Sequence, residues 1–243
     1  MALPTYRLLN KGVIILLCVI LLLMTLSLIK VYLQLPNVVA QMLSEPYDHP
    51  TASPDKEDAD ENIVAYDQLP PKVVLAFVAA EDKTFFHHGG VDYMALMAAL
   101  VESVEEGRFA RGSSTITMQL AKSYLPSKEK NLERKISEIF LAAQIEEVFS
   151  KQEIIEFYLN RIYFGHDRYG IREAAQFYYA KPVSELNLEE GAMIAGLPQA
   201  PSLNNPIQSM QRAQERRNWV LSRMLAAEFI DQEEYLSAVE SSL

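Results

Sequence analysis

From Tyr66 onward, apolar side chains recur every three or four positions, which is the spacing of helices that bury one face. Signals for strands, in which apolar and polar residues alternate, are scarce. Pro70 and Pro71 are well placed to open the first helix, because proline is tolerated in a first turn. Further helices are predicted over residues 92–105, 132–149, 151–163, 188–197 and 210–229. We therefore expect a mainly α-helical domain.

The N-terminal part of the chain has a different pattern, because residues 12–29 carry no charge at all. A run of this length spans the core of a bilayer, and a transmembrane helix is predicted over residues 12–33. Arg7 and Lys11 precede the run and an acidic stretch follows it, so the tail 1–11 is expected in the cytoplasm. A cleaved signal peptide is the alternative, although no A-x-A-like cleavage site follows directly.

Prolines and clustered acids predict a polar linker over residues 34–62, which leaves residues 63–243 for the folded domain. The whole chain has 32 acidic and 22 basic residues and a net charge of -10. This balance argues against a nucleic-acid-binding protein, which normally has a basic surface. The one cysteine, Cys18, lies in the apolar run, so a disulfide framework and a cysteine metal site are excluded.

Two adjacent carboxylates, Glu81 and Asp82, follow the first predicted helix. Glu81 comes four residues after Phe77 and three after Val78, so it should emerge at the edge of the buried face. Burial there would raise its pKa and suit it to general acid or base catalysis. His88 lies close by in a glycine-rich turn. The alternative is an ordinary pair of surface carboxylates near a helix end.

Thr115, Gln119 and Lys122 are spaced at i, i+4 and i+7. On a helix they would form one polar line, while Ile116 and Leu120 would face the core. Such a line could hold an oxygen-rich substrate. The alternative is a capped amphipathic helix with a solvated lysine.

Two further segments could bind an anion. Residues 112–114, which end at Ser114, offer backbone amides and hydroxyls at a helix entrance. Arg134, Lys135 and Glu138 could clamp a pyrophosphate, or could form an exposed intrahelical salt bridge worth a few tenths of a kcal/mol, about 0.2–0.5. We expect them opposite an apolar stripe that consists of Leu132, Ile136, Ile139, Phe140 and Ala143.

In their order and residue identities, these clusters resemble the motifs of the glycosyltransferase family 51 domain, the peptidoglycan polymerase of class A penicillin-binding proteins and monofunctional transglycosylases. The family's first motif, E-D-x-x-F-x-x-H-x-G, matches Glu81, Asp82, Phe85, His88 and Gly90. Four more motifs match residues 112–123, 134–138, 158–165 and 190–202. The resemblance extends over roughly residues 63–230 and implies a lysozyme-like helical fold.

The chain departs from the family pattern at two positions. Met118 replaces the first glutamine of the second motif, and Ser123 replaces its asparagine. Gln119 and Lys122 remain, so we expect activity with some altered substrate contacts. The complete set of S-x-x-K, S-x-N and K-T-G is not present, because K-T-G does not occur, so we expect these residues to contain no penicillin-binding transpeptidase.

The resemblance implies that the enzyme polymerises lipid II into β-1,4-linked glycan strands, inverts the anomeric centre and releases undecaprenyl pyrophosphate. Glu81 would be the general base and Glu138 the second catalytic residue. The substrate-binding residues that it implies are Asp82, Phe85, His88, Ser114, Thr115, Gln119, Lys122, Arg134, Lys135 and Asn160. Mg²⁺ or another divalent cation could assist, although the sequence forms no dedicated metal cage.

The expected partners are lipid II, the lipid-linked glycan strand, the membrane and cell-wall synthesis proteins, and no nucleic acid. The expected location is the bacterial inner membrane, with a single pass, a cytoplasmic N-terminus and an extracytoplasmic catalytic domain. Apolar residues in the predicted helix 92–105 suggest that it dips into the outer leaflet.

Two rival functions stay open. A lysozyme-like enzyme that cleaves peptidoglycan would need neither a pyrophosphate clamp nor an anchor, so Arg134 and Lys135 argue against it. A non-catalytic scaffold for wall assembly is disfavoured by the presence of both Glu81 and Glu138.

Overall fold

A computed structural model of the chain describes residues 63–106, 114–125 and 132–241, together with residues 36–44 and a few positions between 18 and 33. The predicted transmembrane helix 12–33 and the predicted linker 34–62 lie mostly outside the described residues. Among the residues that are described, no helix has both the length and the apolar character needed to cross a bilayer.

The described part of the chain is helical, as predicted, and contains no strand beyond one isolated bridge between Tyr163 and Tyr169. Residues 36–44 are helical. From residue 63 onward the α-helices are α2 (Pro71–Glu81), α3 (Tyr93–Glu106), α4 (Ile116–Tyr124), α5 (Leu132–Val148), α6 (Lys151–Arg161), α7 (Ile171–Tyr179), α8 (Leu188–Ala195), α9 (Met210–Ala226) and α10 (Gln232–Glu240). Short 3₁₀ turns are η2 (Tyr66–Gln68), η3 (Phe85–His87) and η4 (Val183–Glu185).

The predicted helices agree with α3, α5, α6, α8 and α9 to within a few residues. The predicted end of α9 is three residues late, because Glu228 adopts a positive φ of 59° that a helix cannot continue. The sequence analysis did not find α7 and α10. Helix α10 is nine residues long and buries one side chain, that of Ala238, so its helical period is weak. Helix α7 is equally short, but it buries Ile171, Ala174 and Ala175 at i, i+3 and i+4, so its helical period was present in the sequence and was missed.

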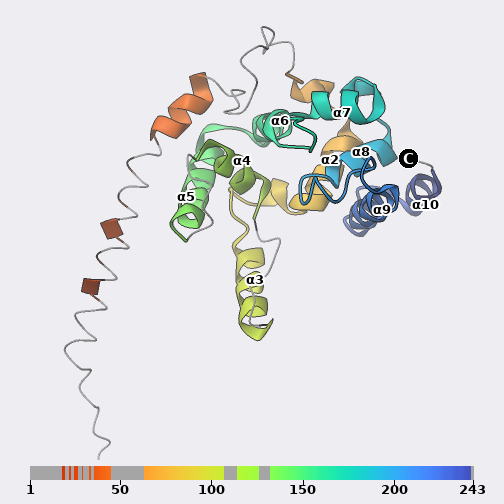
Figure 1. The fold of residues 1–243 in the computed structure, drawn as a ribbon. Coiled ribbons are helices and arrows are strands. Elements are labelled where there is room, and N and C mark those ends of the chain that lie inside the picture. The colour runs from red at the N-terminus through yellow and green to blue at the C-terminus, as the bar shows by residue number, and fades with distance from the viewer. Residues whose placement is uncertain are drawn as a thin grey trace, which may run out of the picture.

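Helix α2 lies in the middle of the helical body and packs against α8 and α9 (Figure 1). Its Phe77 is fully buried and makes edge-to-face contacts with Tyr158 and Phe164, with ring centroids 6.4 and 6.0 Å apart. Such aromatic contacts favour one orientation of the rings. The end of α2, where Glu81 lies, is therefore held in a fixed position.

The predicted apolar stripe of α5 is wrong. Phe140, which belonged to it, is 47% exposed, whereas Ser137, Glu138, Leu141, Ala142 and Ile145 are buried. The buried face is shifted by about one residue, and its carboxylates are paired: Glu138 with Arg134 and Lys135 of α5 itself. Glu146 accepts a hydrogen bond of 2.6 Å from Thr117 of α4. Paired carboxylates can thus occupy positions that the pattern assigned to apolar residues.

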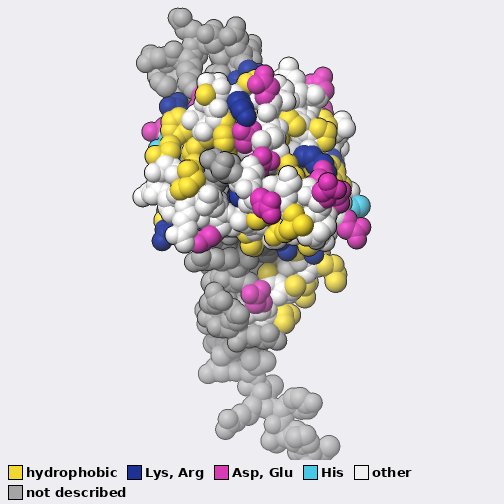
Figure 2. All heavy atoms as spheres, turned by 90° about the vertical axis from the view of Figure 1, so that its right-hand side faces the viewer, with side chains coloured by type: hydrophobic (Ala, Val, Ile, Leu, Met, Phe, Trp, Pro, Cys, Tyr) yellow, Lys and Arg dark blue, Asp and Glu magenta, His cyan; other side chains and the backbone are white. Residues whose placement is uncertain are grey.

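Helix α3 projects from the body and carries an exposed apolar face (Figures 1 and 2). Met94 is 82% exposed, and Tyr93, Met97 and Val101 are also exposed. Exposed apolar residues that gather on one element indicate a contact surface rather than ordinary surface composition.

Gly90 makes a testable contribution to this fold. Its φ is +86°, and a Cβ atom there would lie 2.6 Å from the backbone oxygen of Ala142 in α5. We predict that Gly90→Ala lowers the free energy of unfolding by about 1–3 kcal/mol from the strained φ alone, with the clash in addition. Gly89→Ala is the matched control, because nothing lies within 4 Å of its added Cβ. Denaturant unfolding of both variants measures the difference, and equal stabilities would contradict the assignment.

Candidate active site

A groove of roughly 1010 Å³ opens where the end of α2, the start of α4, the first turns of α5 and the inner side of α9 meet. Nine of the predicted site residues line it, although they come from separate segments of the sequence: Glu81, Asp82, Ser114, Thr115, Gln119, Lys122, Arg134, Lys135 and Glu138. The predicted catalytic pair, Glu81 and Glu138, therefore shares one groove. Gly112 and Ser113 lie outside the described residues.

Glu81 is the last residue of α2, and its carboxylate accepts a hydrogen bond of 2.7 Å at Oε2 from Gln119 Nε2. The hydroxyl of Tyr158 lies 3.4 Å from the other end of the same amide, which orients it. Burial raises the pKa of Glu81, while the Gln119 hydrogen bond and the charge of Arg216 lower it by smaller amounts. The carboxyl group is thus suited to proton transfer.

Asp82 is 8% exposed, and its side chain is committed to the protein. His88 Nε2 lies 3.0 Å from each of its oxygens, and the backbone N–H of Ile116 donates to Oδ2 over 3.0 Å. The positive end of the α4 dipole also stabilises the negative charge of a carboxylate at this position. Asp82 therefore joins the end of α2 to the start of α4.

Phe85 and His88 do not line the groove; they lie behind it. Phe85 is fully buried, and the His88 ring packs edge-on against it with centroids 6.3 Å apart. Lys151 of α6 donates to the His88 carbonyl over 2.7 Å and lies 4.2 Å from the centre of the Phe85 ring. These contacts position Asp82 from behind.

Helix α4 has the predicted amphipathic character, with Ile116 and Leu120 fully buried. Thr115 is its N-cap: Oγ1 accepts a hydrogen bond of 3.1 Å from Met118 N and donates one of 2.6 Å to Gly90 O. Both hydrogen bonds of the Thr115 hydroxyl are therefore made to the backbone of the protein. Lys122, two turns further along, is exposed and faces the groove.

The intrahelical salt bridge that was the alternative for the α5 cluster is present, but it is largely buried rather than exposed. Glu138 is 3% exposed; Arg134 Nη1 lies 3.3 Å from its Oε1 and Lys135 Nζ lies 3.2 Å from its Oε2. Lys135 also donates to Ser114 Oγ over 2.7 Å. Two cations on one carboxylate leave an excess of positive charge at the groove wall, which suits an anionic group.

Asn160 lies outside the groove and fixes the start of the domain. Its Oδ1 accepts from Val64 N over 2.8 Å, and its Nδ2 donates to the carbonyls of Val64 and Glu156, each over 2.9 Å. This amide is fully used in holding the chain at residue 64 against α6.

The sequence analysis missed the wall that α9 contributes. Arg216, Trp219 and Arg223 line the groove, and the Arg216 guanidinium lies 3.9 Å from the Trp219 ring while Nε donates to Gly196 O over 3.2 Å. A signal was available, because α9 concentrates arginines in an acidic chain and carries its only tryptophan. Pro198 and Gln199, within the fifth motif, also line the groove.

The two departures from the family pattern differ in their surroundings. Met118 is buried and lines the groove, so it replaces a polar side chain at the floor with an apolar one. Ser123 is not a lining residue; its Oγ accepts from Arg161 Nε over 2.9 Å and donates to Leu120 O over 2.7 Å. Only the first of the two changes alters the groove itself.

Within the described residues, no group of three or more His, Cys, Asp or Glu side chains could hold a metal ion. Two carboxylates of the groove, those of Glu81 and Asp82, already accept hydrogen bonds from protein donors. This donor set does not fit a protein-bound Mg²⁺. We therefore assign no step of the chemistry to one.

Comparison with known proteins identifies the family. The family described as Transglycosylase matches residues 48–225. The chain belongs to the transglycosylase family. A protein described as a transglycosylase from Cupriavidus necator is 41% identical over 172 residues, which are 71% of this chain and 74% of that protein.

Larger members of the family are also similar to the chain. Penicillin-binding protein 1A of Pseudomonas aeruginosa is 48% identical over 180 residues, which are 74% of this chain and 22% of that protein. The corresponding protein of Escherichia coli is 49% identical over 172 residues, or 71% and 20%. The chain thus spans about a fifth of the length of these two relatives. A crystal structure of penicillin-binding protein 1A from Haemophilus influenzae has a TM-score of 0.44 and 31% identity, over 74% of this chain and 17% of that one.

The surroundings of Glu81 in this chain generate a prediction about its ionisation. A hydrogen-bond donor and a nearby cation both favour the charged carboxylate, so removing either should raise the pKa of Glu81 above its wild-type value. We predict this direction for Gln119→Leu and for Arg216→Gln. The measurement is ¹³C NMR titration of side-chain carboxyl groups, with the Glu81 signal identified by its absence from Glu81→Gln.

Gln211→Leu is the control for this titration, because Gln211 is exposed on α9 and bonds to Glu215 instead. It should leave the Glu81 titration unchanged. A Glu81 pKa that stays constant or falls in both groove variants would contradict the described surroundings.

Proposed function

We propose that this chain polymerises lipid II into β-1,4-linked glycan strands with inversion at the anomeric carbon and release of undecaprenyl pyrophosphate. Membership of the transglycosylase family supports the reaction class. The observation that carries the proposal is the shared groove, in which a buried glutamate, Glu81, and a glutamate that holds two cations, Glu138, both line the wall.

Glu81 is proposed as the general base for the acceptor. Gln119 occupies Oε2, and Oε1 accepts no hydrogen bond from the described residues, so Oε1 is the atom that would take the proton of the sugar 4-hydroxyl. The hydroxyl oxygen then bonds to the anomeric carbon of the donor as the bond from that carbon to the diphosphate oxygen breaks. Because burial raises its pKa, Glu81 is a stronger base than an exposed glutamate.

The leaving diphosphate carries the charge that develops in the transition state, so cations near it contribute most to the rate. Lys122, Arg134 and Lys135 are the proposed groups. Glu138 holds Arg134 and Lys135 at fixed positions, which avoids reorganisation during the reaction. In this proposal Glu138 acts by positioning cations beside the diphosphate.

Both proposed substrates have lipid tails, and the exposed face of α3 suits contact with the membrane that contains them. Tyr93, Met94 and Met97 present apolar surface on an element that projects from the body. Burying such surface in a lipid interface is favourable. A single-pass inner-membrane protein with a cytoplasmic N-terminus remains a prediction from the sequence before residue 34.

The general-base role generates a prediction for the reaction rate. Glu81→Gln keeps the size of the side chain but removes its basic oxygen, so polymerisation of purified lipid II should fall by about 10²-fold or more. Circular dichroism should show an unchanged fold. Glu147→Gln, an exposed position on α5, is the control and should retain full activity.

Analysis of the products separates the proposed reaction from its rival. Chain growth from lipid II supports the polymerase, whereas shortening of purified glycan strands would indicate a hydrolase. Polymerisation by Glu81→Gln at the wild-type rate would remove Glu81 from its role.

The apolar face of α3 generates a prediction for membrane contact. With residues 1–33 removed, so that the predicted anchor does not hold the protein on the membrane, the double variant Met94→Glu, Met97→Glu should bind vesicles of anionic and zwitterionic phospholipid more than about tenfold more weakly than the same domain without the two changes, because two exposed methionines no longer enter the interface. Co-sedimentation with the vesicles measures this. Val148→Glu with Leu236→Glu is the matched control, since both residues are exposed on other helices. Equal loss in the two double variants would contradict a specific role for α3.

A further inference from the structure

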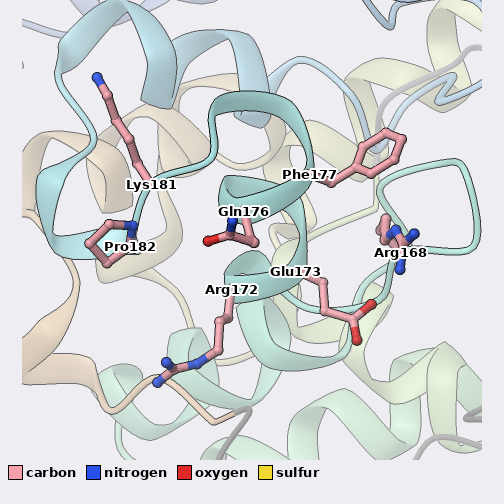
Figure 3. A pocket seen from close by; sticks show the side chains of 7 residues that line it. All are labelled: Arg168, Arg172, Glu173, Gln176, Phe177, Lys181 and Pro182. Carbon is pink, nitrogen blue, oxygen red and sulfur yellow. The ribbon is translucent and has the colours of Figure 1, made fainter.

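A second depression, of about 630 Å³, lies around the outer face of α7 and shares no lining residue with the groove. Figure 3 shows its side chains, which all come from one stretch of sequence, residues 168–182. Three of the seven are cations, Arg168, Arg172 and Lys181, and one is acidic, Glu173. Because the whole chain has a net charge of -10, this positive surface is a local reversal of the charge balance.

The two arginines have hydrogen-bonding capacity to spare. The Arg168 side chain donates no hydrogen bond to the described residues; its guanidinium is held instead against the Phe177 ring, 4.9 Å from the centroid. Stacking of this kind leaves the terminal Nη groups, which lie in the plane of the guanidinium, available for a ligand. Arg172 uses Nη2 to donate to Ile63 O over 3.0 Å, and its Nε is buried without a partner, as is that of Arg168.

Lys181 is already engaged, since its Nζ donates to Glu190 Oε1 over 2.5 Å. Binding capacity therefore resides in the two guanidinium groups, which lie on different sides of α7 in Figure 3, Arg168 beside Phe177 and Arg172 pointing the other way. Glu173 stands between them in the same view, so each arginine offers a separate contact to a ligand. Phe177 and Pro182 add apolar surface beside the cations. A guanidinium fork matches the two oxygens of a carboxylate, and the ring and the proline suit the organic part of the same ligand.

The position of the depression bears on the source of the anion. In Figure 1, α3 projects below the body while α7 lies along its upper part. If α3 contacts the membrane as proposed, α7 is turned away from the lipid headgroups. An anion that reaches α7 is then a carboxylate in solution or on a polymer, rather than a lipid headgroup. The glycan strands of the proposed reaction carry short peptides that end in carboxylates.

We propose that the Arg168–Arg172 depression on α7 binds the carboxylate of a short peptide attached to the glycan, at a site separate from the groove of glycosyl transfer. The identity of the peptide rests on the proposed function. In this arrangement the protein holds its product by the peptide while the groove continues the reaction.

The test is calorimetric titration of the purified full chain with three probes: a disaccharide-tetrapeptide, the same disaccharide without its peptide, and inorganic phosphate. The first should bind saturably and the other two should not. Arg168→Gln should weaken binding by about tenfold or more, because a charged hydrogen-bond donor is lost. Gln176→Glu should weaken it as well, because it places a negative charge beside the carboxylate, and both positions make few contacts that the fold needs.

Arg212→Gln is the matched control: it makes the same charge change at an exposed position on α9 outside both cavities, and should leave binding unchanged. Equal binding of the peptide-free disaccharide or of phosphate would overturn the assignment to a peptide carboxylate. Undiminished binding in Arg168→Gln would overturn the location, and so would no saturable binding at all.

Lipid II polymerisation, measured separately, should be unchanged in Arg168→Gln. Failure of the wild type to polymerise would count against the proposed function, whereas loss of peptide binding with normal polymerisation would count only against this site. The two proposals can therefore fail independently.

Discussion

The groove depends on the hydrogen bonds that His88 and the start of α4 both make to the carboxylate of Asp82. Its oxygens receive His88 from one side and the first backbone amide of α4 from the other, so two helices that are separated by more than thirty residues end at one buried charge. A buried carboxylate that lost either partner would be costly, which makes this junction hard to deform. Because Glu81 directly precedes Asp82, the junction also brings the Glu81 carboxylate within hydrogen-bonding distance of Gln119 on α4. The supporting groups behind the groove, Lys151 among them, stabilise the same junction.

The two glutamates of the groove have opposite surroundings, and this difference supports a division of roles. Glu81 is buried at a helix end with one amide donor, and its pKa is raised. Glu138 is buried with an arginine and a lysine bound to it. A carboxyl group in the first setting can exchange a proton, whereas one in the second setting positions positive charge. The proposed transfer needs both, a base at the incoming hydroxyl and cations at the outgoing diphosphate.

Arginines connect this site with the rest of the domain. Arg216 contributes to the groove wall, and its neighbour Arg217 is buried and donates to the carbonyls of Val239 and Ser241 at the end of α10. Consecutive residues of α9 thus face the reaction site and the last described helix. On α7, the arginines serve a surface that shares nothing with the groove, so the same residue type has three different uses: packing, electrostatics and proposed ligand binding.

The sequence by itself determined the helical class, most helix positions, and the residues that line three sides of the groove, because helical periodicity and the order of short motifs are local properties of the chain. It also placed Glu81 correctly at the edge of a buried face, since Phe77 and Val78 come one turn before it. Only the tertiary structure decided which face of α5 turns inward, that His88 and Asn160 hold the protein rather than line the groove, and that α9 forms a wall with Arg216 and Trp219. These outcomes depend on partners far away in sequence. Side chains such as Glu138 are buried only because other segments supply their hydrogen bonds, and a periodic pattern does not contain that information.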